Sequence, residues 1–427
     1  MHRRSFLAQA AASVVGGALL PAASRASADA APPEQLRTAI AAARYPLEFD
    51  GKRFSGPGLD LMIERGRAAQ AFLLGEEHGI AENPKLAATL FKALVPAGYR
   101  RLAIETSPPI AEALDEQLRG GGLKALERFV TTPGSQAVFF GLREEAEWLA
   151  AARASVPGDA PLLWGLDYEL TADRYLLSRL RLMPKPPAAR RALAVLDASS
   201  AAWWAKYAAT HDPGTIFSFA GDPALALALS EAWPSAGPKA RVIIETLVET
   251  LTINRAWTSG GGYSSNLLRS RWLRSNFLRN WRVLERSEPD AHIFMKFGAS
   301  HMIRGLSLAD VFDLGSLVPD LVAERGGETF HLLVLPGKDS LTANFDPTRL
   351  RYVPGHRDEY GKGLEPFFAA AFADTYTLYE TAPLRPLVRT DSTSVEPMLA
   401  KIIHGFDAVL IMTGSHPSTN LDELPSQ

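Results

Sequence analysis

Two short stretches of the sequence place a histidine three residues after a glycine, each directly after an apolar run. The first is Gly75-Glu-Glu-His78 and the second is Gly298-Ala-Ser-His301. Glycine allows a tight exit from a strand and a close approach of a ligand to the backbone. An imidazole with an ordinary pKa of about 6.5 suits proton transfer around pH 7, which typically contributes roughly a hundred- to ten-thousandfold in rate. The matching frames therefore indicate a shared site for acid-base chemistry or ligand binding.

Carboxylates accompany the first histidine and end two further apolar runs. Glu76 and Glu77 precede His78, while Glu105 and Asp167 each follow another run. Taken singly, each acid is typical of a loop or a helix cap. Parallel strands present their carboxyl ends at one edge of a sheet, where open α/β folds bind their ligands. The four runs are therefore predicted to bring these groups to one crevice.

The residues are compatible with three kinds of site. In the first, His78 is a general base that takes a proton from water, Glu76 or Glu105 orients its imidazole, and His301 donates to or positions a carbonyl under attack. In the second, His78, Glu105 and His301 hold a divalent zinc, manganese or iron ion, with Glu76 or Glu77 as the base. In the third, a histidine binds haem or another ligand and the protein catalyses nothing.

The runs that carry these residues have the length of strands and alternate with helical patterns. After the first run, Leu86, Leu90, Phe91 and Leu94 fall at helical spacing, and Gly98 is placed as a stop. Continuous apolar runs joined by such helices predict an α/β fold, with a mostly parallel sheet covered by helices on both faces. Six strands are expected, over residues 71–75, 101–105, 161–167, 292–298, 331–336 and 407–412.

A long segment between the third and fourth strands carries no strong strand signal. Residues from about 171 to 289 are rich in Ala, Leu and Arg, which predicts a helical insertion whose tryptophans are more typical of packing than of a substrate pocket. The helical stretch near its end carries Arg269, Arg271 and Arg274, candidates for stabilising an oxyanion or binding a substrate carboxylate. At that spacing on one helix, at least one of the three is expected to face solvent.

The first 28 residues have the pattern of a cleaved twin-arginine signal peptide. Arg3 and Arg4 precede a mildly apolar stretch, which ends at the small-residue cleavage site Ala26-Ser-Ala28. That stretch is too short and too rich in Ala, Gly and Ser for a membrane span, which needs about 20 strongly apolar residues. Residues 29–427 are then predicted to form a single α/β domain in the periplasm or secreted, without a membrane anchor after cleavage.

Composition excludes several classes of protein. The formal net charge is −2 and no cysteine is present, which excludes a cysteine nucleophile, a cysteine zinc site and a lipoprotein anchor. The mild acidity gives no electrostatic footprint for nucleic acid. The sequence contains no Gly-x-Ser-x-Gly elbow, no Gly-x-x-x-x-Gly-Lys loop, and no Gly-x-Gly-x-x-Gly after the first strand. A serine hydrolase of the α/β-hydrolase type and a nucleotide cofactor are therefore not expected.

The order of these motifs resembles that of the erythromycin esterase-like proteins. "LLGEEHGIAENPKLAATLFKALVPAGYRRLAIETS" is similar to the family's opening, in which a Gly-Glu-(x)-x-His-Gly motif precedes a helix and a second strand ending in Glu. "RSRWLRSNFLRNW" resembles its arginine-rich helix with an Asn position, here Asn276, and "FGASHMIRG" its second histidine motif. "STSVEPMLAKIIHGFDAVLIM" resembles its closing helix and strand, so the order holds from about residue 70 to 412.

The resemblance implies a hydrolase that acts on an ester, lactone or amide of a small molecule or peptide, and the signal peptide implies that this hydrolase is exported. Its implied centre is His78, Glu76, Glu105 and His301. The implied substrate-binding residues are Asp167, Arg271, Glu77, Arg269 and Asn276. The broader grouping includes Tiki and TraB-like metalloproteases and ChaN-like haem-binding proteins, so a divalent metal at His78, Glu105 and His301, or a haem, remains the alternative cofactor.

Overall fold

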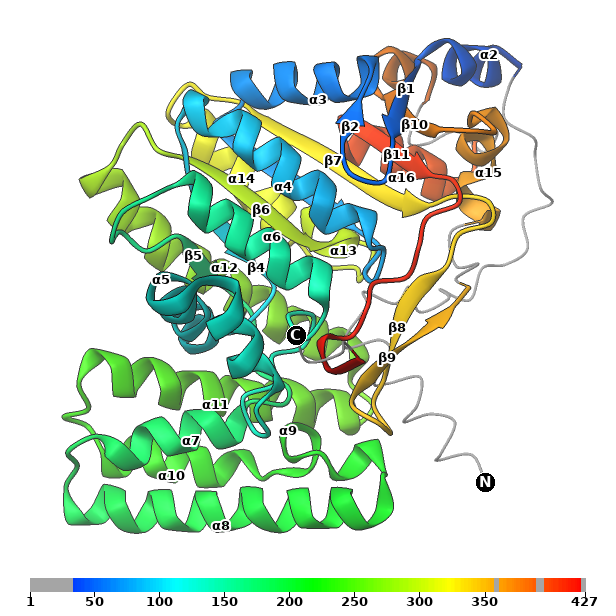
Figure 1. The fold of residues 1–427 in the computed structure, drawn as a ribbon. Helices are drawn as coiled ribbons and strands as arrows, with labels where there is room; N and C mark the ends of the chain where they lie inside the picture. The colour runs from blue at the N-terminus through cyan, green and yellow to red at the C-terminus, as the bar shows by residue number, and fades with distance from the viewer. Residues whose placement is uncertain (1–33, 357–360, 389–394, 424–427) are drawn as a thin grey trace.

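The computed structural model describes residues 34–356, 361–388 and 395–423, and the predicted signal peptide lies outside them. A nine-stranded sheet forms the centre of the fold (Figure 1). Its strands are β1 (Arg44–Phe49), β2 (Phe54–Ser55), β3 (Ala71–Glu76), β4 (Tyr99–Ile104), β5 (Leu163–Gly165), β6 (His292–Gly298), β7 (Thr329–Pro336), β10 (Tyr376–Glu380) and β11 (Ala408–Met412). They are ordered β2-β1-β10-β11-β7-β3-β6-β4-β5 across the sheet.

The predicted α/β class and all six predicted strands are confirmed. From β11 to β5 every neighbouring pair is parallel, so β3, β4, β5 and β6 end at the same edge. The antiparallel edge, where β10, β1 and β2 continue the sheet, was not predicted. A separate hairpin of β8 (Thr342–Asp346) and β9 (Arg351–Gly355) was not predicted either. These strands mix polar and partly exposed residues with apolar ones, and β1 contains Pro46, so none reads as a continuous apolar run.

Helices cover both faces of the sheet, as predicted. On one face the core includes residues of α3 (Pro57–Ala68), α4 (Glu82–Leu94), α5 (Pro108–Thr131) and α6 (Arg143–Ser155). On the other it includes residues of α2 (Glu34–Ala42), α12 (Gly262–Ser287), α13 (Ala299–Met302), α14 (Leu314–Ala323), α15 (Gly361–Ala370) and α16 (Pro397–Gly405). Alternate residues of β3 divide between the two cores: Phe72 and Leu74 pack on the first face and Leu73 on the second. This alternation fixes which side of the sheet each later residue of the strand faces.

The helix after β3 forms where its apolar spacing predicts it. Leu86, Leu90, Phe91 and Leu94 are all fully buried on one side of α4. The short 3-10 turn that follows ends at Gly98, whose φ of 102° lies in the left-handed region that glycine adopts without strain. The chain is thereby returned to the start of β4.

The predicted helical insertion lies between β5 and β6. It consists of α7 (Asp173–Leu182), α8 (Pro187–Thr210), α9 (Phe217–Ala220), α10 (Pro223–Ala232), α11 (Pro238–Thr258) and α12. The green helices α7, α8, α10 and α11 lie together below the sheet in Figure 1. Trp204 and Trp233 are buried in the core there, and Trp204 Nε1 donates to Asp173, so both pack rather than line a pocket. Among the described residues, no helix combines the length and apolarity that a membrane crossing requires.

Candidate functional site

The ends of four parallel strands bring the predicted ionisable residues into contact. Glu76 ends β3 and His78 follows it, Glu105 follows β4, and Asp167 follows β5 by two residues. His301 lies in α13, the single helical turn that begins directly after β6. All five side chains are buried. They form a compact polar cluster at the carboxyl edge of the sheet, which we call the centre.

His78 is held between two carboxylates. Its Nδ1 lies 2.9 Å from Glu76 Oε1, and its Nε2 lies 3.4 Å from Glu105 Oε2. The ring of Phe139 stacks on the imidazole with 4.1 Å between ring centroids. The contact with Glu76 fixes the orientation of the ring and leaves Nε2 facing the interior of the centre.

His301 approaches the other oxygen atom of the Glu105 carboxylate. Its Nδ1 lies 2.7 Å from Asp313 Oδ2, and its Nε2 lies 3.5 Å from Glu105 Oε1. Asp313 is the N-cap residue of α14, where its second oxygen accepts from Leu314 N. Asp313 was not among the predicted site residues, because an acid before an apolar helix is typical of a cap. In the structure Asp313 both caps α14 and holds the imidazole of His301.

Glu105 contacts further residues of the centre besides its two histidine neighbours, because both of its oxygen atoms also accept hydrogen bonds. Its Oε1 accepts from Arg269 Nη2 at 2.7 Å, and its Oε2 accepts from the backbone N–H of Gly298 at 2.7 Å. Arg269 also donates to both carboxylate oxygens of Asp167, at 3.0 and 2.5 Å. The guanidinium therefore joins the ends of β4 and β5 and sets the position of Glu105 between the two imidazoles.

The two Gly-x-x-His frames interlock through their glycines. A Cβ atom on Gly298 would lie 2.9 Å from Nε2 of His78, so the glycine of the second frame makes room for the histidine of the first. A Cβ atom on Gly75 would lie 3.0 Å from Cβ of Met302 and 3.1 Å from Cα of Ala299, both in α13. Each glycine thus admits the other motif, which explains why the same frame occurs at the ends of β3 and β6.

A buried lysine connects the centre to helix α6, which packs on the sheet. Lys296 Nζ donates to Glu76 Oε1 and to Glu145 Oε1, each at 2.6 Å. Lys296 lies on β6 and Glu145 on α6, and both are buried. Neither residue was among the predicted site residues. A single lysine inside an otherwise apolar strand was the available signal, because lysine is almost never fully buried unless it is paired.

Burial and charge act in opposite directions on the ionisable groups of the centre. Burial opposes the charged form of His78, but the carboxylates of Glu105 and Glu76 outweigh it and raise the pKa of His78 to about 9. Burial also opposes the charge of His301, and Asp313 with Glu105 raises its pKa to about 10. Burial raises the pKa of Glu105, but the two imidazoliums hold it well below its ordinary value. Two imidazoliums therefore flank one carboxylate in this arrangement.

Two nitrogen atoms of the centre lack a hydrogen-bond partner. Nε2 of His78 and Nε2 of His301 are both buried, and neither makes a hydrogen bond, although Glu105 lies 3.4 to 3.5 Å from each. A buried polar atom without a partner carries a desolvation penalty of about 1–3 kcal/mol. The two nitrogens come from different elements and flank Glu105, so an oxygen atom of a bound molecule beside each of them would supply the missing partner.

Phe139 covers His78 in an unfavourable backbone conformation. Its φ of 71° lies in the left-handed region, which is uncommon for a residue with a bulky side chain. Its backbone N–H donates to the hydroxyl of Tyr352 at 2.8 Å. Tyr352 and Val138 line a cavity of about 110 Å³ between the end of α5 and the β8–β9 hairpin. The ring of Phe139 therefore packs on His78, while its backbone is hydrogen-bonded to Tyr352, a residue that lines this cavity.

The remaining predicted substrate-binding residues occupy different environments. Arg271, two residues after Arg269 on α12, is exposed, as the helix spacing predicted for at least one of the arginines. Asn276 is buried and its Nδ2 donates to Leu166 O at 2.8 Å, which fixes the backbone just before Asp167. Glu77 is buried beside the centre, and its backbone carbonyl accepts from Asn83.

The donor atoms of the centre fit a metal ion poorly. Both oxygens of Glu105 already accept hydrogen bonds, from Arg269 and from Gly298 N–H. Within the part of the chain that the structure describes, no group of three or more His, Asp or Glu is arranged to hold a metal ion. The metal alternative therefore gains no support from this geometry.

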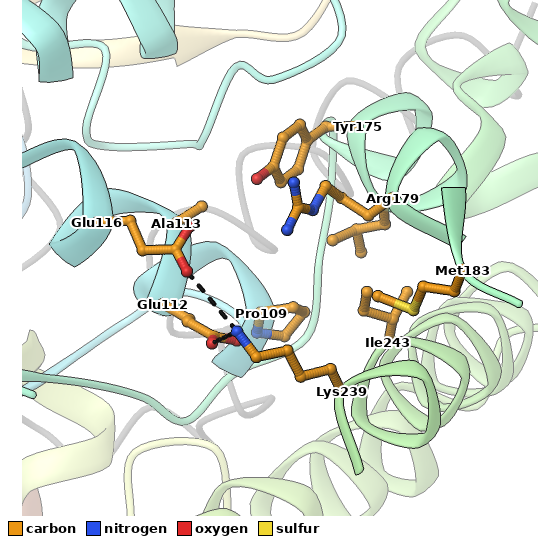
Figure 2. A pocket seen from close by; sticks show the side chains of 10 residues that line it. Pro109, Glu112, Ala113, Glu116, Tyr175, Arg179, Met183, Lys239 and Ile243 are labelled. Atoms are coloured by element: carbon orange, nitrogen blue, oxygen red, sulfur yellow. Dashed lines mark ion pairs between the residues drawn. The ribbon is translucent and has the colours of Figure 1, made fainter. Parts of the chain in front are cut away.

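A second, smaller hollow lies away from the centre. Figure 2 shows it between α5, α7 and α11, where Lys239 forms ion pairs with Glu112 at 2.6 Å and Glu116 at 3.7 Å. These side chains are between about two fifths and three fifths exposed, so the pairs contribute little to stability. None of the residues that line the hollow belongs to the centre.

Solved structures of other proteins share this fold at low sequence identity. An erythromycin esterase, the EreC mutant in its open conformation, has a TM-score of 0.57 at 19% identity and covers 88% of this chain and 98% of its own. A Bacillus cereus protein and a succinoglycan biosynthesis protein each have a TM-score of 0.55 at 13% identity over 90% of this chain, and cover 98% and 97% of their own. No protein-family model and no curated protein matches the sequence. The fold is erythromycin esterase-like.

Proposed function

We propose that the protein is an exported hydrolase in which His78 activates a water molecule for attack on the carbonyl of an ester, lactone or amide. The observation that carries the proposal is the pair of buried Nε2 atoms, on His78 and His301, that face Glu105 without a hydrogen-bond partner. Catalytic hydrogen bonds are often incomplete until substrate is bound. Water and a substrate carbonyl supply the two oxygen atoms that these nitrogens lack.

Each residue of the centre has a defined part in this reaction. His78 acts as the base after losing its Nε2 proton, and it takes a proton from water, whose oxygen attacks the carbonyl carbon. Glu76 holds Nδ1–H and stabilises the imidazolium that forms. When the tetrahedral intermediate collapses, the carbon–oxygen or carbon–nitrogen bond breaks and His78 returns the proton to the leaving group. The products are a carboxylic acid and an alcohol or amine.

His301 and Arg269 supply positive charge where the oxyanion develops. His301 is held by Asp313 in the protonated form at neutral pH, so its Nε2–H can donate to the carbonyl oxygen. Removing one such donor from an enzyme typically slows it by roughly a hundred- to a thousandfold. Arg269 keeps Glu105 fixed and adds a guanidinium to the same low-dielectric space.

Two considerations favour hydrolysis over haem binding. A hydrolase needs a carboxylate within hydrogen-bond reach of His78, and Glu76 meets this requirement at 2.9 Å. A haem ligand has to stand exposed above a broad apolar slot, whereas His78 is buried beneath Phe139. The name of one structural neighbour, erythromycin esterase, supports ester or lactone substrates as the first class to examine.

A substrate screen with one active-site variant tests the proposal. Purified protein is assayed against esters, lactones, including a macrolide, and peptide amides, beside His78→Ala and the control His211→Asn. His211 is an exposed residue at the end of α8 with a left-handed φ of 50°, which asparagine tolerates. Hydrolysis that is lost in His78→Ala and kept in His211→Asn is expected. Equal turnover by all three proteins would refute the assignment.

The proposed site of action is the periplasm or the cell exterior. The sequence evidence is the pair Arg3 and Arg4 before an apolar stretch that ends at Ala28. A fusion of the first residues to a reporter that is exported only when folded is expected to reach the periplasm, and Arg3→Lys/Arg4→Lys is expected to abolish this. Export of the double variant at the wild-type level would contradict the twin-arginine route.

A further inference from the structure

Lys296 lies in an environment that lysine ordinarily avoids. Its side chain is 4% exposed, on a central strand whose face is otherwise packed by residues such as Phe72 and Phe294. The ammonium lies 5.3 Å from the centroid of the Trp148 ring. Burying an isolated charge of this kind is very unfavourable, so the ammonium requires compensation by opposite charge. Glu76 and Glu145, each at 2.6 Å, provide it.

The two carboxylates that compensate the charge of Lys296 come from different places, one from the catalytic centre and one from a helix that packs on the sheet. Glu76 belongs to the centre through its 2.9 Å contact with His78. Glu145 comes from α6, and it contacts the same ammonium group. Acids and bases therefore alternate in one continuous row, which consists of Glu145, Lys296, Glu76, His78, Glu105, His301 and Asp313. Every member of this row is buried.

Two hydrogen-bond donors share the same oxygen atom of Glu76. Its Oε1 accepts both from Lys296 Nζ and from His78 Nδ1, while its Oε2 is buried without a partner. Without Lys296, the carboxylate of Glu76 would be held only by the imidazole, and it would be free to rotate and exchange Oε1 for Oε2 at His78 Nδ1. The ammonium, fixed on a rigid central strand, restricts that rotation and keeps Oε1 directed at Nδ1.

We propose that Lys296 is a positioning residue of the hydrolytic centre: it holds Glu76 in the orientation that directs His78 Nε2 at the reacting atoms, and Glu145 holds Lys296 in turn. The proposal rests on the proposed function for its catalytic consequence, but the physical coupling along the row exists in the resting protein. Neither Lys296 nor Glu145 touches the substrate. Their effect passes entirely through Glu76.

A double-mutant cycle on turnover tests the catalytic consequence. The variants are Glu76→Gln, Lys296→Met and the double variant, each checked for native secondary structure. Lys296→Met alone is expected to lower kcat by roughly ten- to a hundredfold, the range typical when a partner that orients a functional group is lost. Because Lys296 acts through Glu76, the double variant is expected to be no slower than Glu76→Gln alone. Independent losses that multiply in the double variant would overturn the proposal.

A measurement without substrate separates this inference from the proposed function. In Glu145→Gln, which preserves side-chain volume, the imidazole pKa of His78 is read from its NMR chemical shifts. Loss of the Glu145 charge is expected to lower that pKa relative to wild type, while His292 at the opposite end of β6 serves as the reference in the same spectra. An unchanged His78 titration would overturn the coupling, whether or not any ester is hydrolysed. If Lys296→Met does not fold, this titration decides the question by itself.

Discussion

Gly298 and His78 lie in contact across the boundary between β6 and the loop after β3. A side chain at position 298 would meet the imidazole directly, because its Cβ would lie 2.9 Å from Nε2. The φ of Gly298 is −53°, which any L-residue can adopt. The glycine is therefore required by the space that His78 occupies and not by the backbone conformation.

Substitution of Gly298 by alanine is expected to disturb catalysis more than folding. The added methyl group displaces His78 or Glu105, and a displacement of about 1 Å at reacting atoms typically slows an enzyme roughly a hundredfold. The overpacking is expected to destabilise by about 1–3 kcal/mol. Gly120→Ala, with open space around the new Cβ, is the matched control and should leave both kcat/KM and Tm near wild type. Full activity in Gly298→Ala would mean that His78 Nε2 is not the reacting atom.

Hydrolysis is expected to accelerate with pH up to about pH 9. A base must be neutral, and a pKa of about 9 leaves roughly one His78 in a hundred neutral at pH 7. The rate should therefore rise about tenfold per pH unit between pH 6 and 8. Glu76→Gln removes one of the charges that raise this pKa, so its profile should shift to lower pH while its plateau falls. A pH-independent wild-type rate over the same interval is incompatible with this role for His78.

Asp313→Asn is expected to separate the two roles of Asp313. Asparagine keeps the oxygen that accepts from Leu314 N, so α14 should stay capped and stability should change by less than about 1 kcal/mol. The carboxylate that raises the pKa of His301 is lost, so less His301 is protonated and the oxyanion is less well stabilised. A drop in kcat of roughly ten- to a hundredfold, largest at alkaline pH, is the expected result. Thermal melting and pH-rate profiles of the variant check both parts.

Arg269 and Arg271 provide a matched pair on one helix. Arg269→Met leaves Glu105 and Asp167 buried without their guanidinium, and breaking a buried ion pair typically destabilises by about 3–5 kcal/mol. Arg271→Met changes an exposed residue and is expected to alter stability by less than about 0.5 kcal/mol. Urea denaturation of the two variants measures the difference. Equal stability of both would show that the Arg269 pairs contribute nothing net.

Stability is expected to decrease above neutral pH. The folded-state pKa values of His78 and His301, about 9 and about 10, exceed the ordinary value of 6.5, so their contribution is fully present below pH 6.5. It is lost as pH rises through the folded pKa values, at about 1.4 kcal/mol per group for each pH unit in between. Tm measured from pH 6.5 to 10 should therefore fall, and less steeply in His301→Gln. A Tm that rises across this range would show that the imidazoles are not held charged.

Local patterns in the sequence were sufficient for most of the fold. Apolar runs of strand length located β3, β4, β5, β6, β7 and β11, and helical spacing located α4, because both signals depend only on near neighbours along the chain. The strands of the antiparallel edge gave no such signal. Their burial depends on what covers them, so β1 and β10 were recognisable only after the sheet had formed.

The sequence alone determined which chemical groups are available at the carboxyl edge of the sheet. The frames ending in His78 and His301, together with Glu105, already specified two imidazoles and a carboxylate. Tertiary structure decided which further groups join them. Arg269 faces the centre and Arg271 faces solvent because packing sets the rotation of α12. Lys296 meets Glu76 only through contact between strands far apart in the chain, and Asp313 meets His301 only where the chain after α13 turns back to the start of α14. The balance of charge and burial that fixes the protonation of these groups exists only in the folded protein.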